Sequence, residues 1–267
     1  MRILFLGDVV GISGCSKIMN NLLDQIKKNQ IDFVIVNGEN AAESGVGLTK
    51  EICEDFFKCG VNVITTGNHV WDQKEIMTFI DNESRLLRPK NLFEPAPGKG
   101  FEIYTVKDNI KIGVLNLMGN VFMKKCDDVF EESKKFIEKY KIKEDFDFLI
   151  IDFHGEITSE KNAIGHFFDG KATLVVGTHT HIPTNDARVL KNGTAYQTDA
   201  GMCGDYDSVI GMNKDNSLNR FMKKDSVKHF PAKGEATLSG VIVECNIETG
   251  LANKIDSFIF GDYLNNT

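Results

Sequence analysis

Short apolar runs alternate with amphipathic stretches over the first third of the chain. Three apolar runs have the length and composition of buried strands: residues 2–6, 33–36 and 61–65. Three amphipathic stretches predict helices: residues 16–29, 49–59 and 73–81. Strands that alternate with helices in this way favour a parallel sheet with right-handed crossovers.

The pattern changes after about residue 100. A predicted hairpin is followed by strands and helices in alternation and then by short strands: residues 101–106, 110–117, 129–140 (helix), 146–152, 159–168 (helix), 172–176, 187–190, 195–198, 240–246 and 253–260. Residues 204–234 have no clear period, so they are expected to form an irregular loop region on the substrate side. Two sheet systems follow from this order, and the expected fold is an α/β sandwich flanked by helices, with a single domain over residues 1–267.

Composition narrows the class of protein. With 42% hydrophobic and 26% charged residues, the chain is expected to be soluble and globular. Its net charge of -7 disfavours binding to a nucleic-acid backbone, and no sequence-specific nucleic-acid partner is expected. No apolar stretch approaches the roughly 20 residues that span a bilayer. The six cysteines are scattered, which is typical of free thiols, and no signal peptide is apparent, so the expected compartment is the cytoplasm.

Polar residues of metal-ligand type follow five of the predicted strands. They are Asp8, Glu39 with Asn40, Asn68 with His69, His154, and His179 with His181. Each has a simpler structural explanation by itself, such as a turn cap for Asp8 or a hydrogen-bonded core histidine for His154. The carboxyl ends of strands in α/β sheets meet at one crevice, however, and alternate residues of an extended segment point the same way. The joint pattern therefore favours a metal site at these strand ends.

The order of these residues resembles that of calcineurin-like binuclear metallophosphoesterases. The motifs are Gly7-Asp8, Gly38-Glu39-Asn40, Gly67-Asn68-His69, His154-Gly155-Glu156 and Gly177-Thr178-His179-Thr180-His181. Two positions depart from the wider superfamily: Val10 stands where a histidine is usual, and Glu39 where an aspartate is usual. At both positions the sequence resembles that of a bacterial subfamily, the YmdB-like phosphodiesterases. The runs at 199–202 and 208–212 also resemble the sequence of this subfamily.

The resemblance implies a four-layer α/β/β/α sandwich with two metal ions at the carboxyl ends of the strands. Metal one would be held by Asp8, Glu39, Asn40 and His181, with Asn40 in place of the missing histidine. Metal two would be held by Glu39, Asn68, His154 and His179. Oxygen and imidazole ligands suit iron first, with manganese and zinc as alternatives.

The resemblance also implies hydrolysis of a phosphodiester, with 2′,3′-cyclic nucleotides as the favoured substrate class. Two ions about 3.5–4 Å apart would carry a bridging hydroxide that attacks phosphorus. His69 follows the ligand Asn68 and is the candidate general acid, or else a residue that holds a ligand in place. Glu156 is a candidate to orient His154. Candidate substrate contacts are Asn120, Tyr206, Ser208 and Arg220.

Two other functions stay open at this point. One is a metal-dependent phosphomonoesterase that acts on nucleotides or phosphoproteins. The other is a non-catalytic scaffold that binds a nucleotide, for which the absence of a donor atom at Val10 is the main support. The sequence also leaves open a homo-oligomer.

Overall fold

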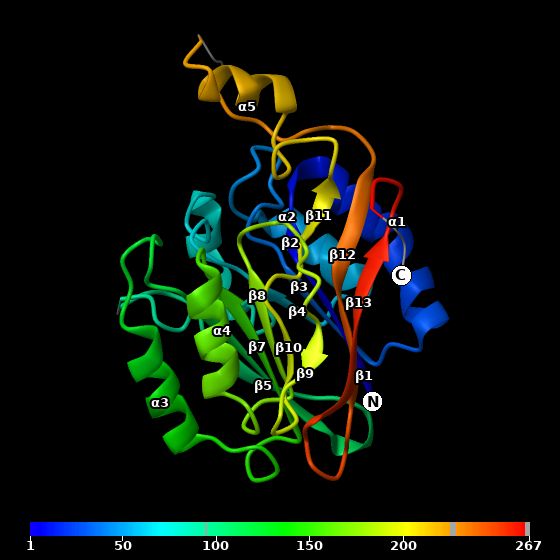
Figure 1. Cartoon of the computed structure of the whole chain (residues 1–267), viewed down its shortest axis with the longest axis vertical. Helices are drawn as coiled ribbons and strands as arrows, with labels where there is room; N and C mark the ends of the chain where they lie inside the picture. Colours follow the sequence, from blue (N-terminus) through cyan, green and yellow to red (C-terminus); the bar gives the residue numbers. More distant parts are fainter. Residues whose placement is uncertain (94, 225–227, 265–267) are drawn as a thin grey trace.

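Two β-sheets face each other in the computed structural model, which describes residues 1–93, 95–224 and 228–264 (Figure 1). The first sheet has the strand order β2-β11-β12-β1-β3-β4, and β13 pairs with β12. Its strands are β1 (Arg2–Leu6), β2 (Asp8–Val9), β3 (Phe33–Asn37), β4 (Val63–Thr65), β11 (Met202–Asp205), β12 (Ala236–Cys245) and β13 (Ala252–Phe260). β1, β3 and β4 are parallel, whereas β12 runs antiparallel to β1.

The second sheet has the order β5-β6-β7-β8-β10-β9. Its strands are β5 (Phe101–Thr105), β6 (Lys111–Met118), β7 (Phe148–His154), β8 (Leu174–Thr178), β9 (Arg188–Val189) and β10 (Ala195–Gln197). β6, β7, β8 and β10 are parallel, and β5 forms the predicted hairpin with β6. β3 and β7 are buried along their whole length, because both faces of each sheet are covered; this explains why they appear in the sequence as continuous apolar runs.

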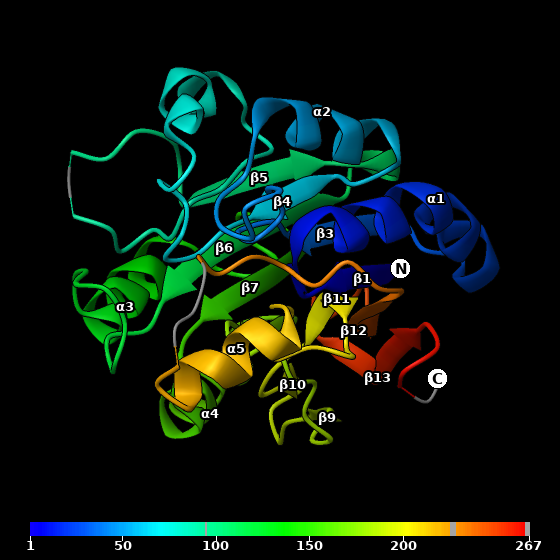
Figure 2. The same cartoon turned by 90° about the horizontal axis from the view of Figure 1, so that it is seen from above.

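Three apolar cores separate four layers. The middle core lies between the sheets and joins residues such as Phe5 and Ile35 to Val114 and Ile150. The outer cores lie under α1 (Gly11–Asn29) and α2 (Lys50–Lys58) on one side, and under α3 (Val129–Lys139) and α4 (Thr158–Phe167) on the other. Figure 2 shows these two helix pairs on opposite sides of the sheets. The predicted α/β/β/α sandwich is confirmed.

Some predicted elements have different limits or a different type. α1 begins at Gly11 and not near residue 16. Gly11 adopts a φ of +61°, and Gly14 lies directly against the Cys203 carbonyl, where a side chain would not fit. The helix predicted at 73–81 is two 3-10 helices, η1 (Lys74–Thr78) and η2 (Ile80–Asn82). A third, η3 (Lys107–Asn109), forms the hairpin turn.

The region predicted as irregular, residues 204–234, is more ordered than expected. It contains the end of β11 and the helix α5 (Lys214–Phe221), although residues 225–227 lie outside the described part. The Asn213 side chain caps α5 by accepting from the Asn216 amide. In Figure 1, α5 stands apart from the two sheets, at the top of the view.

Two findings bear on the environment of the chain. All six cysteines are free thiols, as expected, and five of them are buried. Within the described residues, none of the helices combines the length and the apolar character that a bilayer crossing requires.

Candidate metal centre and active site

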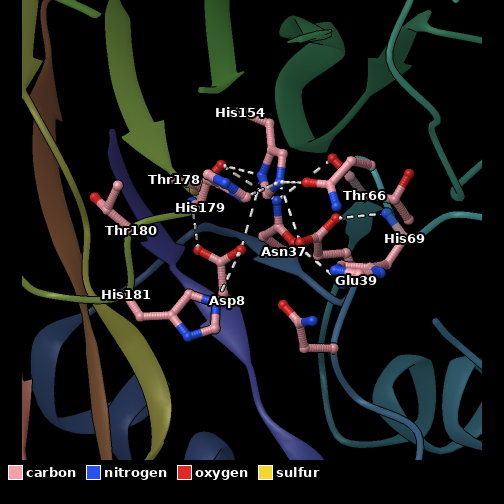
Figure 3. Close-up of polar contacts among 12 residues, drawn as sticks. Asp8, Asn37, Glu39, Thr66, His69, His154, Thr178, His179, Thr180 and His181 are labelled. Carbon is pink, nitrogen blue, oxygen red and sulfur yellow. Dashed lines mark hydrogen bonds and ion pairs between the residues drawn. The ribbon is translucent and has the colours of Figure 1, made fainter. Parts of the chain in front are cut away.

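Glu39, His154 and His179 meet at the carboxyl ends of the parallel strands, with donor atoms that lie within 4.8 Å of one another (Figure 3). His154 Nε2 is 3.1 Å from Glu39 Oε1 and 3.1 Å from His179 Nδ1. Asn68 Oδ1 lies 3.0 Å from the same nitrogen. Four side chains from both sheets thus surround one position, and these four form the set predicted from the sequence for metal two.

Asp8 and Asn40 provide a second group of oxygen atoms beside Glu39. Within the described residues, Asp8 Oδ1 and Asn40 Oδ1 are both buried and have no hydrogen-bond partner. The other side-chain atoms are engaged: Asp8 Oδ2 accepts from the His179 amide at 3.0 Å, and Asn40 Nδ2 donates to the Gly45 carbonyl at 2.9 Å. Buried polar atoms are normally satisfied, so these two oxygens are available to an added donor or a cation.

His181 lies beside Asp8, at a distance longer than a hydrogen bond. Its Nε2 is 3.9 Å from Asp8 Oδ1 (Figure 3). The other ring nitrogen, Nδ1, donates to the Ile210 carbonyl at 2.8 Å. A carbonyl can only accept, so Nδ1 carries the proton and the Nε2 lone pair is free to bind a metal. Val10 is buried close by and packs under Gly211, where a larger side chain at 211 would collide with it.

Acids and imidazoles in the cluster shift one another's pKa values, because they lie close together in a buried site. Burial opposes the charged form of Glu39, but His154 and His69 outweigh burial and lower its pKa to about 2. Burial likewise opposes the imidazolium of His154, yet Glu39, Asp8 and Asp152 raise its pKa to about 9. Burial raises the pKa of Asp8, and burial together with His154 lowers that of His179 to about 3. Such perturbed groups are typical of functional sites.

The backbone around the ligands is closely packed. A Cβ at Gly67 would lie 2.3 Å from Glu39 Oε2 and from the His154 ring, so this position accepts glycine alone. His179 and His181 adopt φ values of 95° and 66°, which are unusual for residues with a side chain. Strain of this kind persists where surrounding contacts hold it, and it concentrates at functional sites.

His69 lies at the edge of the cluster. Its amide donates to Glu39 Oε2 at 3.1 Å, and its Nδ1 is 2.6 Å from Asp72 Oδ2. Lys124 lies next to them: its Nζ donates to the Asn68 carbonyl at 2.6 Å and is 3.8 Å from Asp72 Oδ1. Asp72 thus engages Nδ1 of the His69 ring, and Nε2 is the other ring nitrogen.

Residues 4–258 match the family described as YmdB-like protein. The chain belongs to this family. A Bacillus subtilis relative named 2′,3′-cyclic-nucleotide 2′-phosphodiesterase is 43% identical over 262 residues, which are 98% of each chain.

Two solved structures have the same fold as this YmdB-like chain. One, a novel phosphatase from Mycoplasma pneumoniae, has a TM-score of 0.90 at 38% identity and covers 98% of this chain and 93% of its own. The other, a hypothetical protein from Thermus thermophilus, has a TM-score of 0.90 at 37% identity and covers 98% of this chain and 100% of its own. The resemblance to metallophosphoesterases seen in the motifs is confirmed at the level of the family and the fold.

The four candidate substrate contacts of the YmdB-like chain differ in whether their polar groups are engaged within the protein. Asn120 accepts from the Val129 amide and donates to the Asp127 carbonyl. The Tyr206 hydroxyl bonds the backbone of Met202, and that of Ser208 donates to Asp205 and accepts from Gly211. These three polar groups support loops, whereas Arg220 is exposed on α5. Their contact with substrate stays a prediction.

Glu156 does not contact His154 as expected. Its Oε2 lies 3.0 Å from Nε2 of His179, which leaves Nδ1 of His179 turned to the cluster. The expectation failed because the backbone turns after β7 and brings Glu156 to the neighbouring strand end.

Four acids and bases near the cluster have no role predicted from the sequence: Asp72, Asp152, Lys161 and Asp199. Lys161 Nζ donates to Asp199 Oδ2, and Asp199 Oδ2 also accepts from the amide and hydroxyl of Thr180, between the two histidines. A charged residue inside an apolar strand, such as Asp152, is a signal that could have been used.

Proposed function

We propose that this chain is a metal-dependent phosphodiesterase that hydrolyses 2′,3′-cyclic nucleotides. The observation that carries the proposal is the pair of orphan buried oxygens, Asp8 Oδ1 and Asn40 Oδ1, beside the Glu39, His154 and His179 cluster. The name of the Bacillus subtilis relative, at 43% identity, supports the substrate class. The reaction would take place in the cytoplasm, in one domain spanning the chain, and the free thiols are in keeping with that compartment.

The residues present fit two metal ions. Asp8, Asn40 and His181 would hold the first, Asn68, His154 and His179 would hold the second, and Glu39 would bridge them. The donor set contains oxygen and imidazole nitrogen without thiolate, which suits iron, manganese or zinc, and we place iron first. When bound, the ions supply Lewis acidity for the phosphoryl group and lower the pKa of water.

The residues of the chain orient the substrate and move the proton. A water oxygen forms a bond to phosphorus, and the bond from phosphorus to a sugar oxygen breaks. That oxygen needs a proton, and His69 would provide it from Nε2, because Asp72 occupies Nδ1 and fixes the plane of the ring. Lys124 brings a positive charge to the same rim, where it would attract the anionic substrate.

The test is an assay of metal-stripped protein after addition of Fe²⁺, Mn²⁺ or Zn²⁺. Substrates are 2′,3′-cyclic AMP, bis-p-nitrophenyl phosphate and p-nitrophenyl phosphate. Turnover that needs metal and favours the cyclic diester is the expected result. A large preference for the monoester would instead favour a phosphomonoesterase, for which the Mycoplasma structure called a phosphatase is the supporting observation. A folded protein that binds nucleotide tightly but contains no metal would instead favour a non-catalytic scaffold.

A further inference from the structure

A buried carboxylate lies beneath the candidate metal centre and contacts residues of both sheets. Asp152 is on β7, in the second sheet, and is 0% exposed. Asp152 Oδ2 accepts from Asn37 Nδ2 at 2.8 Å and from the Thr65 hydroxyl at 2.5 Å, and both donors lie on the first sheet. Asp152 Oδ1 accepts from the Thr178 hydroxyl at 2.7 Å, at the end of β8. Three donors therefore converge on one carboxylate, which leaves it poorly suited to bind a metal itself.

The hydroxyl of Thr178 links Asp152 to His154. Because Thr178 donates its proton to Asp152, its oxygen is left to accept. The next atom is His154 Nδ1, at 2.9 Å. A proton on Nδ1 satisfies this contact, and the lone pair of a neutral His154 is then on Nε2, which is the nitrogen that faces Glu39, Asn68 and His179.

A second connection runs to the bridging carboxylate. Asn37 donates to Asp152, and the Asn37 Oδ1 atom accepts from the Glu39 amide at 3.1 Å. The position of Asp152 is thus coupled to two candidate ligands that come from opposite sheets. Removing it would disturb both the direction of the His154 ring and the backbone at Glu39.

From these contacts we infer that Asp152 is a positioning residue: acting through Thr178, it holds His154 with Nδ1 protonated and Nε2 directed at metal two. The inference deepens the proposed function and rests on it. Partners of this kind behind a ligating histidine set its tautomer and orientation, and their loss typically costs about 10–100-fold in metal affinity.

The test compares isosteric variants by their Zn²⁺ affinity, measured by competition with a chelator. T178V keeps the shape of the side chain and removes the hydroxyl, and D152N replaces an acceptor with a group that must also donate. Both should bind the second Zn²⁺ about 10–100-fold more weakly than wild type. T178S restores the hydroxyl and should restore the affinity. The absorption spectrum of Co²⁺-substituted T178V should also differ from that of wild type.

A matched control separates positioning from general stability. Thr173 directly precedes β8, at the end of the strand opposite Thr178; it is 0% exposed and donates to the Gly250 carbonyl at 2.6 Å. T173V therefore loses a buried hydroxyl far from the centre and should keep wild-type Zn²⁺ affinity. Equal weakening in T173V and T178V, or wild-type affinity in both T178V and D152N, would overturn the inference.

A measurement without metal distinguishes this inference from the proposed function. In ¹⁵N-histidine-labelled, metal-free protein, the His154 Nδ1 proton should exchange slowly in wild type and T178S, where the hydroxyl accepts it, and rapidly in T178V. If wild type binds no Zn²⁺, the proposed function fails, and the Nδ1 proton still decides whether Thr178 holds His154. A wild-type spectrum without a protected Nδ1 proton would overturn the positioning role itself.

Discussion

Lys161 Nζ lies 2.7 Å from Asp199 Oδ2, although the two side chains are only 1% and 0% exposed. The pair sits directly behind the segment that presents His179 and His181, and the lysine also donates to the Thr180 hydroxyl at 3.0 Å. A fully buried ion pair is rare unless each charge is compensated, and here Asp199 Oδ1 also accepts from the Gly201 amide at 2.8 Å. Through Thr180, the pair contacts the segment between the two histidines, which both have positive φ values.

Replacing Lys161 should lower the stability of the fold. K161M keeps the length of the side chain but leaves Asp199 buried without its cation, which should lower the free energy of unfolding by about 3–5 kcal/mol. Urea unfolding measures this loss. K58M, at the exposed pair with Asp55, is the control and should leave the unfolding midpoint unchanged. Equal midpoints for K161M and wild type would contradict a structural role for the pair.

His69 should affect turnover and not metal content. H69A removes the proposed proton donor, so kcat should fall by about 10²–10⁴-fold at saturating metal. D72N should have a smaller effect in the same direction, because the ring stays in place and loses the carboxylate at Nδ1. Elemental analysis must show wild-type metal content in both variants. If H69A loses metal, His69 holds a metal ligand in place and is not the proton donor.

Asp8 and His181 should control the first metal selectively. D8A or H181A should lower the metal content from two ions toward one, because each removes a donor on the side of Asn40 and leaves the cluster around His154 intact. Elemental analysis after gel filtration measures this stoichiometry. H166A, an exposed histidine in the last turn of α4, is the matched control and should retain both ions. Depletion of both ions by D8A would mean that the two positions are not independent.

Metal affinity should rise with pH because His154 binds a proton that the metal must displace. Its pKa in the metal-free fold is raised to about 9, mainly by Glu39 against the opposing effect of burial. Zn²⁺ affinity should therefore increase roughly tenfold per pH unit below about pH 9. Isothermal titration in two buffers of different ionisation enthalpy measures the released proton. Affinity that is flat between pH 7 and 8.5 would contradict this.

The same shift sets the sign of a stability effect in the metal-free protein. A histidine whose pKa is higher in the folded than in the unfolded state stabilises the fold fully below its ordinary value of 6.5. That contribution is lost as the pH rises through about 9. The unfolding midpoint of the metal-free protein should fall over this interval, and H154N should show a smaller fall.

Much of the architecture could be predicted from local pattern alone. Buried strands such as β3 and β7 appear as continuous apolar runs, and α2 shows both its apolar face and the Thr49 cap in its sequence. The limits of α1 could not be predicted, because glycines at 11 and 14 disfavour a helix by local propensity. Contact with Cys203, almost two hundred residues away, requires a glycine at 14 and outweighs that propensity.

The sequence by itself determined the order of strands and helices and the residues of metal-ligand type at five strand ends, because both depend on local period and on chemical type. The tertiary structure decided how these parts meet. β12 returns from the end of the chain to pair with β1, and Asn37 reaches Asp152 across 115 residues. Which ring nitrogen faces the site, and which acid holds it there, depends on contacts between segments whose separation leaves no trace in local pattern.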